Sequence, residues 1–123
     1  MKKLLAVLAL IVASAGMAQA QHSATLTWGA STPGTCAGTP TLAYNVFRGT
    51  TAGGEGTTPL NATPLTVLTF SDTTVALGTT YFYKVQATEV CGNFTLLSAF
   101  SNEVTAIFPS APTAPVLQPL VIN

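Results

Sequence analysis

Hydrophobic and polar residues alternate most clearly between residues 77 and 87. Tyr81, Tyr83, Val85 and Ala87 fall on one face of an extended chain, and the residues between them fall on the other. A period of two residues is typical of a β-strand with one buried face. This segment is therefore predicted to be the central strand of a sheet.

The same alternation recurs elsewhere, and it is interrupted by stretches rich in Gly, Ser, Thr and Pro. The predicted strands lie within residues 23–28, 42–48, 65–71 and 99–108, with a short edge segment at 59–61. The intervening loops cover residues 29–40 and 50–58. No helical periodicity follows residue 20, and closely spaced turns between short strands are typical of an all-β fold.

The inward faces of these strands predict the core. Leu77 and Tyr81 flank a turn that contains Gly78, an arrangement typical of a tyrosine corner, in which the ring packs inward and the hydroxyl bonds to turn backbone. The predicted core consists of Leu26, Trp28, Tyr44, Val46, Leu77, Tyr81, Tyr83 and Val85.

Five sequence pieces, in this order and spacing, resemble a bacterial fibronectin type III domain across residues 23–108. They are Leu26-Thr27-Trp28, residues 44–50, Phe70-Ser71-Asp72, residues 77–87 and Ser101-Asn102-Glu103-Val104. The resemblance implies an immunoglobulin-like antiparallel β-sandwich with Trp28 in the core beside Tyr44. It implies no particular activity, because this fold supports many functions.

The first 20 residues have the three parts of a secretory signal peptide. Lys2 and Lys3 precede an apolar run, which ends before Ala18-Gln19-Ala20. The run is shorter than the ~20 residues that a membrane-spanning helix needs, so secretion is favoured over an anchor. We expect a signal peptide (1–20), one domain (21–108) and a Pro-rich tail (109–123), with no membrane span after cleavage and a secreted, extracellular or periplasmic bacterial location.

The first strand of the family, strand A, has no counterpart in this chain. Only residues 21–27 precede Trp28 after cleavage, whereas the tail resembles the linker and strand A of a following domain. The tail is therefore a candidate donor strand for a neighbouring molecule. Its alternatives are disorder, a reversed pairing with its own chain, and a spacer to a partner. The donor residues would be Val116, Leu117, Leu120, Val121 and Ile122.

Cys36 and Cys91 are the only cysteines, and in an exported chain such a pair predicts a disulfide. Two thiolates alone make a poor zinc site, so no metal is expected. The resemblance places both cysteines at one pole of the sandwich, near Phe94, Leu96 and Leu97. There the bond would either stiffen a recognition surface or stabilise a small core.

The charged residues and the absence of known catalytic motifs argue against several classes of function. Residues 21–123 carry two basic and four acidic side chains, with no basic patch for nucleic acid. His22 is the only histidine and lies at the predicted mature terminus. No nucleophile elbow, dinucleotide motif or phosphate loop occurs, so neither catalysis nor a cofactor is expected.

The sequence thus predicts a non-catalytic secreted module for structure, assembly or adhesion. Its partner would be a second copy, bound head-to-tail through the tail and extending into a filament. The alternative is a monomeric module that binds an extracellular protein or glycan through the disulfide-tied loops.

Overall fold

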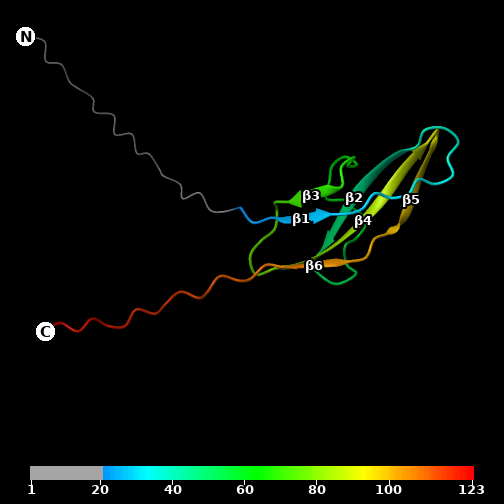
Figure 1. Ribbon diagram of the computed structural model, residues 1–123. Coiled ribbons are helices and arrows are strands. Elements are labelled where there is room, and N and C mark those ends of the chain that lie inside the picture. Colours follow the sequence, from blue (N-terminus) through cyan, green and yellow to red (C-terminus); the bar gives the residue numbers. More distant parts are fainter. Residues whose placement is uncertain (1–20) are drawn as a thin grey trace, which may run out of the picture.

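The computed structural model describes residues 21–123, and the predicted signal peptide lies outside this range. Within it the chain forms strands and no helix, which confirms the all-β class. The strands are β1 (Ala24–Thr27), β2 (Thr41–Gly49), β3 (Thr69–Asp72), β4 (Thr80–Cys91), β5 (Phe94–Phe100) and β6 (Val104–Ile107) (Figure 1).

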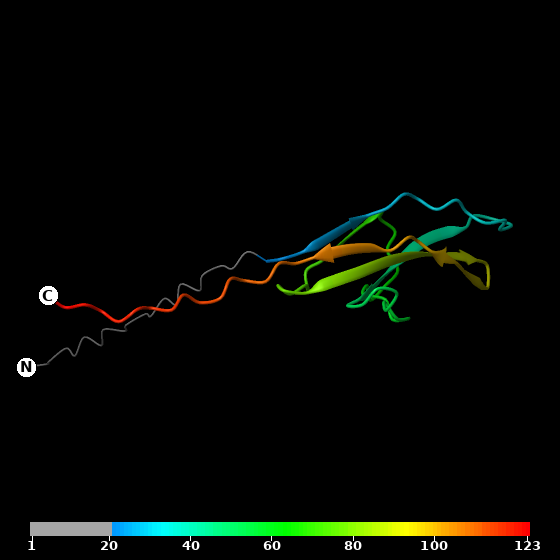
Figure 2. The same ribbon diagram turned by 90° about the horizontal axis from the view of Figure 1, so that it is seen from below.

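These strands build two antiparallel sheets. β1 pairs with β3 in a two-stranded sheet, and β4 lies between β2 on one side and β5 with β6 on the other. The short sheet covers only part of the longer one, so β2, β4 and β5 extend beyond it (Figures 1 and 2). The predicted immunoglobulin-like, fibronectin type III-like β-sandwich is confirmed.

β4 is the central strand, as its alternation predicts. Tyr81, Tyr83, Val85 and Ala87 are buried between the sheets, because successive side chains of a strand point to opposite faces. Across the sheet, β2 places Val46 opposite Val85.

The core forms around these β4 residues. Leu77 is not part of it, since 45% of its surface is exposed. Leu77 lies in the turn before Gly78, which has φ 70°, and strand alternation does not extend into this turn. The corner itself is present, because the Tyr81 hydroxyl accepts the Ala76 N–H at 3.1 Å. The buried core cluster is Leu26, Tyr44, Val46, Tyr81, Tyr83, Val85 and Ala87, with Trp28 packed against it and partly buried.

The last predicted strand differs from expectation. It begins at Phe94 and is divided into β5 and β6 at residues 101–103. The β4–β5 register also shifts within β5, between Gln86 and Thr88 of β4. Along this irregular stretch, serine hydroxyls accept backbone N–H groups of β4 that the carbonyls of a regular neighbouring strand would accept. The Ser98 and Ser101 Oγ atoms each accept a β4 backbone N–H at 2.9 Å.

The sequence pattern also missed burial on the outer face of the long sheet. Phe47 is buried there, with its ring 5.2 Å from that of Phe100 in an edge-to-face contact. Aromatic residues therefore pack on both faces of β2.

Candidate functional site

Strands β2 and β1 each have one edge that no other strand of the sandwich covers, and these two edges differ in their hydrogen bonding. The free edge of β2 is covered by residues 60–65, where Leu65 exchanges two 2.8 Å backbone bonds with Tyr44 and the Leu60 N–H reaches the Val46 carbonyl at 2.7 Å. Among residues 21–123, β1 pairs only with β3. The second edge of β1 is thus unpaired.

The backbone groups at this edge can be assigned from the pairing. The Trp28 N–H donates to the Leu68 carbonyl at 3.1 Å, so Trp28 and Leu26 direct their backbone groups toward β3. In an antiparallel pair, alternate residues direct these groups to opposite sides. Thr25 and Thr27 therefore present their N–H and C=O groups to the unpaired edge.

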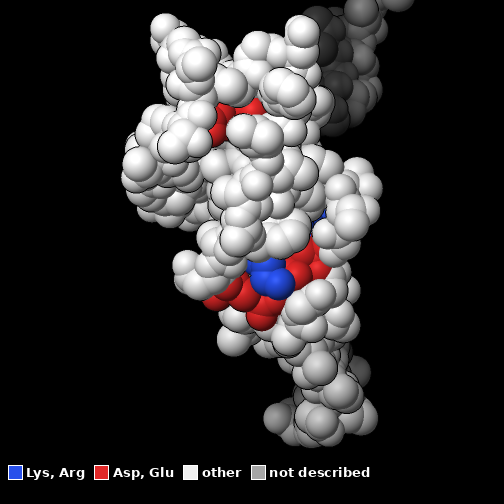
Figure 3. Space-filling view, turned by 90° about the vertical axis from the view of Figure 1, so that its right-hand side faces the viewer, with Lys and Arg blue, Asp and Glu red and all other residues white. Residues whose placement is uncertain are grey.

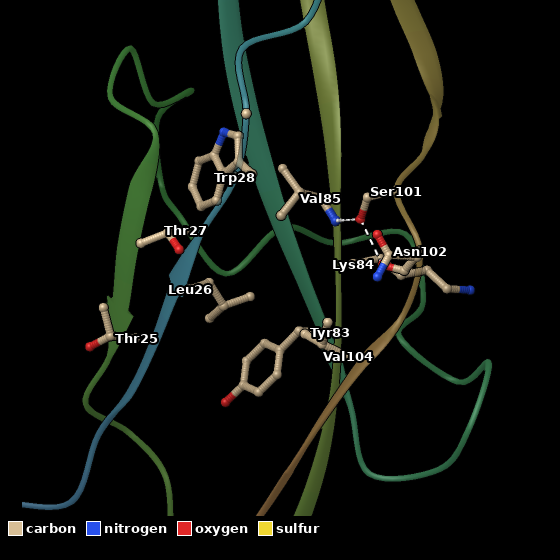
Figure 4. A pocket seen from close by; sticks show the side chains of 11 residues that line it. Thr25, Leu26, Thr27, Trp28, Tyr83, Lys84, Val85, Ser101, Asn102 and Val104 are labelled. Carbon is tan, nitrogen blue, oxygen red and sulfur yellow. Dashed lines mark hydrogen bonds between the residues drawn. The ribbon is translucent and has the colours of Figure 1, made fainter.

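A groove follows this edge, which we call the edge groove. Its largest part has a volume of about 530 Å³ and lies between β1 and the strands β4 and β6 (Figure 4). Adjoining hollows extend it along β6 and toward Ser31. Side chains lining its largest part include Leu26, Trp28, Tyr83, Val85, Ser101 and Val104.

Core residues line the edge groove, which indicates an incomplete sandwich. Leu26, Tyr83 and Val85 belong to the buried cluster, whereas Val104 is exposed. The Trp28 indole nitrogen is buried with no hydrogen-bond partner in the described part of the chain. A buried N–H without a partner costs about 1–3 kcal/mol. The groove is therefore lined by apolar surface, and a buried indole N–H beside it has no partner in residues 21–123.

The tail leaves the body at the end where β1 begins and runs away from it (Figures 1 and 2). Its last backbone contacts are near Gly78, whose N–H donates to the Pro109 carbonyl at 3.2 Å. The structure does not place the tail in the edge groove of its own chain. The predicted donor residues Val116, Leu117, Leu120, Val121 and Ile122 are 83–92% exposed.

The opposite end, which we call the disulfide pole, carries the predicted Cys36–Cys91 bond. This bond, with a Cα–Cα distance of 5.8 Å, ties the 29–40 connection to the end of β4. Two further contacts fix the same connection. The Ser31 N–H donates to the Tyr44 hydroxyl at 2.8 Å, and the Gly34 N–H donates to Glu89 Oε2 at 3.0 Å.

A second hollow, the pole hollow, lies beneath this connection and has a volume of about 280 Å³. Leu42, Glu89 and Leu96 are direct neighbours across β2, β4 and β5 and line it together. Glu89 is only 7% exposed, and its Oε1 has no partner in residues 21–123. The alternation that predicted the buried face of β4 also reaches Glu89, so this signal could have identified it. Phe94, Leu96 and Leu97, the predicted recognition residues, are exposed on β5 rather than in a loop.

A polar network between the two sheets was also missed. Asp72 of β3 accepts hydrogen bonds from Arg48 Nη1 at 2.7 Å and the Tyr83 hydroxyl at 2.8 Å. Burial opposes ionisation, but these bonds and two from Thr74 hold the pKa of Asp72 below its usual value. Burial and the bond to Asp72 raise the pKa of Tyr83. Arg48 also lies over the Tyr81 ring, 4.8 Å from its centroid.

Both basic residues of the described range have acidic partners. Arg48 contacts Asp72 at 2.7 Å, and Lys84 contacts Glu55 at 3.4 Å. Figure 3 looks onto the disulfide pole and shows a basic group surrounded by acidic atoms, and separately recessed acidic atoms with no basic atom beside them. The acidic groups seen from this side are thus in two different environments.

Among residues 21–123, no group of three His, Cys, Asp or Glu side chains is placed to hold a metal ion. No helix in this range is long and apolar enough to cross a membrane.

No protein-family profile matches the chain. The chain is similar to part of exoglucanase B of Cellulomonas fimi, with 36% identity over 92 residues. The aligned region includes 75% of this chain but only 7% of exoglucanase B. The similarity is thus to a small region of a much larger enzyme.

Proposed function

We propose that this protein is a non-catalytic extracellular module that assembles by strand addition, with the edge groove of one copy accepting the tail of the next. The observation that carries this proposal is the unpaired edge of β1 beside a groove lined by core residues and by the exposed Val104. An added strand would satisfy the Thr25 and Thr27 backbone groups and cover apolar surface. The similarity to a small part of a larger enzyme supports a non-catalytic role and an extracellular location.

Chain direction favours a second copy over the same chain. A strand that pairs antiparallel with β1 must run in the same direction as β6. The tail already leaves the far end of β6, so it would have to reverse and pair parallel with its own β1. The tail of a neighbour in line can enter at the disulfide pole and run antiparallel to β1. Repetition of this contact gives an open head-to-tail filament.

The length of the tail fits this arrangement. Residues 109–115 contain three prolines and would span roughly 22 Å in the extended polyproline conformation. Residues 116–123 would span about 26 Å as a strand, slightly more than the edge from Ser23 to Gly29 at about 23 Å. The first part thus serves as a spacer and the second as the inserted strand.

Pro119 determines which tail residues face the core. Proline has no N–H, so its backbone nitrogen must point away from β1. Pro119 and the tail residues two positions before and after it then lie opposite the inward-facing residues of β1, such as Leu26 and Trp28. Their side chains are therefore directed inward. Leu117 and Val121 would therefore enter the edge groove, and Leu120 and Ile122 would face solvent.

Two matched double variants of the full chain test this proposal. Leu117→Asp with Val121→Asp places charges in the groove, whereas Leu120→Asp with Ile122→Asp places them in solvent. Each inward side chain contributes about 1.5–3 kcal/mol, so loss of both should weaken association by roughly a hundredfold or more. The measurement is light scattering over a concentration series, with negative-stain microscopy.

We expect oligomers from the wild type and the solvent-facing variant, and monomers from the inward variant. A wild type that stays monomeric at all concentrations would refute assembly. Equal behaviour of the two variants would refute the pairing set by Pro119. A monomer that loses stability only in the inward variant would show that the tail pairs with its own chain.

A second candidate function is binding of a glycan or protein at the disulfide pole. Exposed Phe94, Leu96 and Leu97 on a stiffened pole favour it, and exoglucanase B is by its name a glucan-degrading enzyme. The test is co-sedimentation with insoluble β-glucan, with Phe94→Ser as the variant. Retention that depends on Phe94 would support it, and no retention would exclude the glycan.

A further inference from the structure

The pole hollow contains a carboxylate whose hydrogen-bonding capacity is only partly used. Glu89 is 7% exposed, and one of its oxygens accepts a single bond from the Gly34 N–H. The other oxygen has no partner in residues 21–123. A buried carboxylate is costly unless it is paired and hydrogen-bonded. The site therefore favours a ligand that brings a positive charge with N–H donors.

The described chain supplies no such group from its own basic residues. Arg48 is bound to Asp72, and Lys84 is bound to Glu55. In a second copy, residues 21–123 would bring the same two occupied lysine and arginine side chains. We therefore assign the complementary cation to a different molecule.

The walls of the pole hollow indicate the shape of that cation. Leu42 and Leu96 stand on either side of Glu89 along one row across the sheet, and hydroxyl-bearing Ser31 and Thr32 line the rim. A volume of about 280 Å³ is small for a ligand pocket, which typically measures about 300–1,000 Å³, so it suits one side chain. An alkyl chain between the leucines would bring a terminal charge to the carboxylate.

We propose that the pole hollow binds a primary alkylammonium group, the lysine side chain of an extracellular partner protein. Lysine is favoured over arginine because a guanidinium prefers to bind both carboxylate oxygens, and one oxygen already accepts the Gly34 N–H. Glucan is disfavoured because no aromatic side chain lines this hollow. The inference is independent of strand addition and names a ligand for the second candidate function.

The test compares two small probes on the oxidised full chain by amide chemical-shift titration. Nα-acetyl-lysine methylamide carries the ammonium, and Nα-acetyl-norleucine methylamide has a similar apolar chain without it. We expect saturable shifts at residues 31–34 and 96–98 with the lysine probe only. In Glu89→Gln the lysine response should weaken at least tenfold, whereas Glu103→Gln, a carboxylate bonded to the Gly53 N–H, should keep it.

The outcomes separate this proposal from the other two. No shift with the lysine probe, or equal shifts with both probes, would overturn it. Shifts at these residues only with a soluble β-glucan oligomer would overturn it in favour of a glycan. The titration is made on the full chain with Leu117→Asp and Val121→Asp, which is expected to stay monomeric, because filaments of the wild type would broaden the amide signals. If Glu89→Gln does not fold in this background, the two probes without it still decide whether the hollow binds the ammonium group. A failure here leaves the strand-addition proposal intact.

Discussion

Replacement of Asp72 by Asn should weaken the contact between the two sheets and so lower the free energy of unfolding. The substitution hardly changes the side-chain volume. Asp72 accepts four hydrogen bonds, from Arg48 Nη1, the Tyr83 hydroxyl, and the N–H and hydroxyl of Thr74. Each Asp72 oxygen accepts two of these bonds. An Asn amide can accept at one atom only, so its NH₂ group would face two of these donors.

The expected cost follows from the loss of a buried ion pair. Removing one partner of such a pair typically costs about 3–5 kcal/mol, and we expect about 3 kcal/mol because the Arg48 side chain is 24% exposed. For a domain of this size that corresponds to a fall in Tm of roughly 12 °C or more. The measurement is urea unfolding at neutral pH, with Glu103→Gln as the control for loss of a carboxylate.

The pH dependence gives an independent check. Hydrogen bonds from Thr74, Tyr83 and Arg48 outweigh burial and lower the pKa of Asp72, so the folded state binds fewer protons than the unfolded state in acid. Its contribution is present above the unfolded pKa of about 3.9 and is lost as the pH falls through the lower folded value. Asp72→Asn should therefore have a flatter acid profile than the wild type. A loss below about 1 kcal/mol, with an unchanged acid profile, would refute the importance of this network.

Two further predictions concern the disulfide and the close backbone contact at Gly49. Replacing both Cys36 and Cys91 by Ala opens a loop with a sequence separation of 55 residues and should cost about 4 kcal/mol in urea unfolding; a cost near zero would show that Ser31 and Gly34 hold the connection without the bond. Gly49→Ala places a Cβ against the Gly54 carbonyl and should cost about 1–3 kcal/mol in thermal unfolding. Gly29→Ala, whose Cβ meets nothing within 4 Å, is its control, and equal losses in the two variants would contradict the predicted clash.

Local alternation was sufficient to predict most of the fold. A strand exposes alternate side chains to opposite faces, so the pattern of residues 81–87 identified the buried side of β4 without reference to the rest of the chain. Leu77 shows where this reasoning ends, since the pattern was extended into a turn whose backbone is not that of a strand. The disulfide followed from an even cysteine count in a predicted exported chain.

The candidate sites depend on contacts between distant segments, which a periodic pattern does not contain. Glu89 belongs to the alternating set of β4 residues that face inward, but it is the 29–40 connection and the disulfide that enclose it. The edge groove likewise results from the short β1–β3 sheet and its unpaired strand. The sequence alone determined the fold class, the central strand and the disulfide, because these depend on local periodicity and residue type. Only the tertiary structure decided which edge is open and which carboxylate is buried, because both depend on how segments far apart in the chain cover one another.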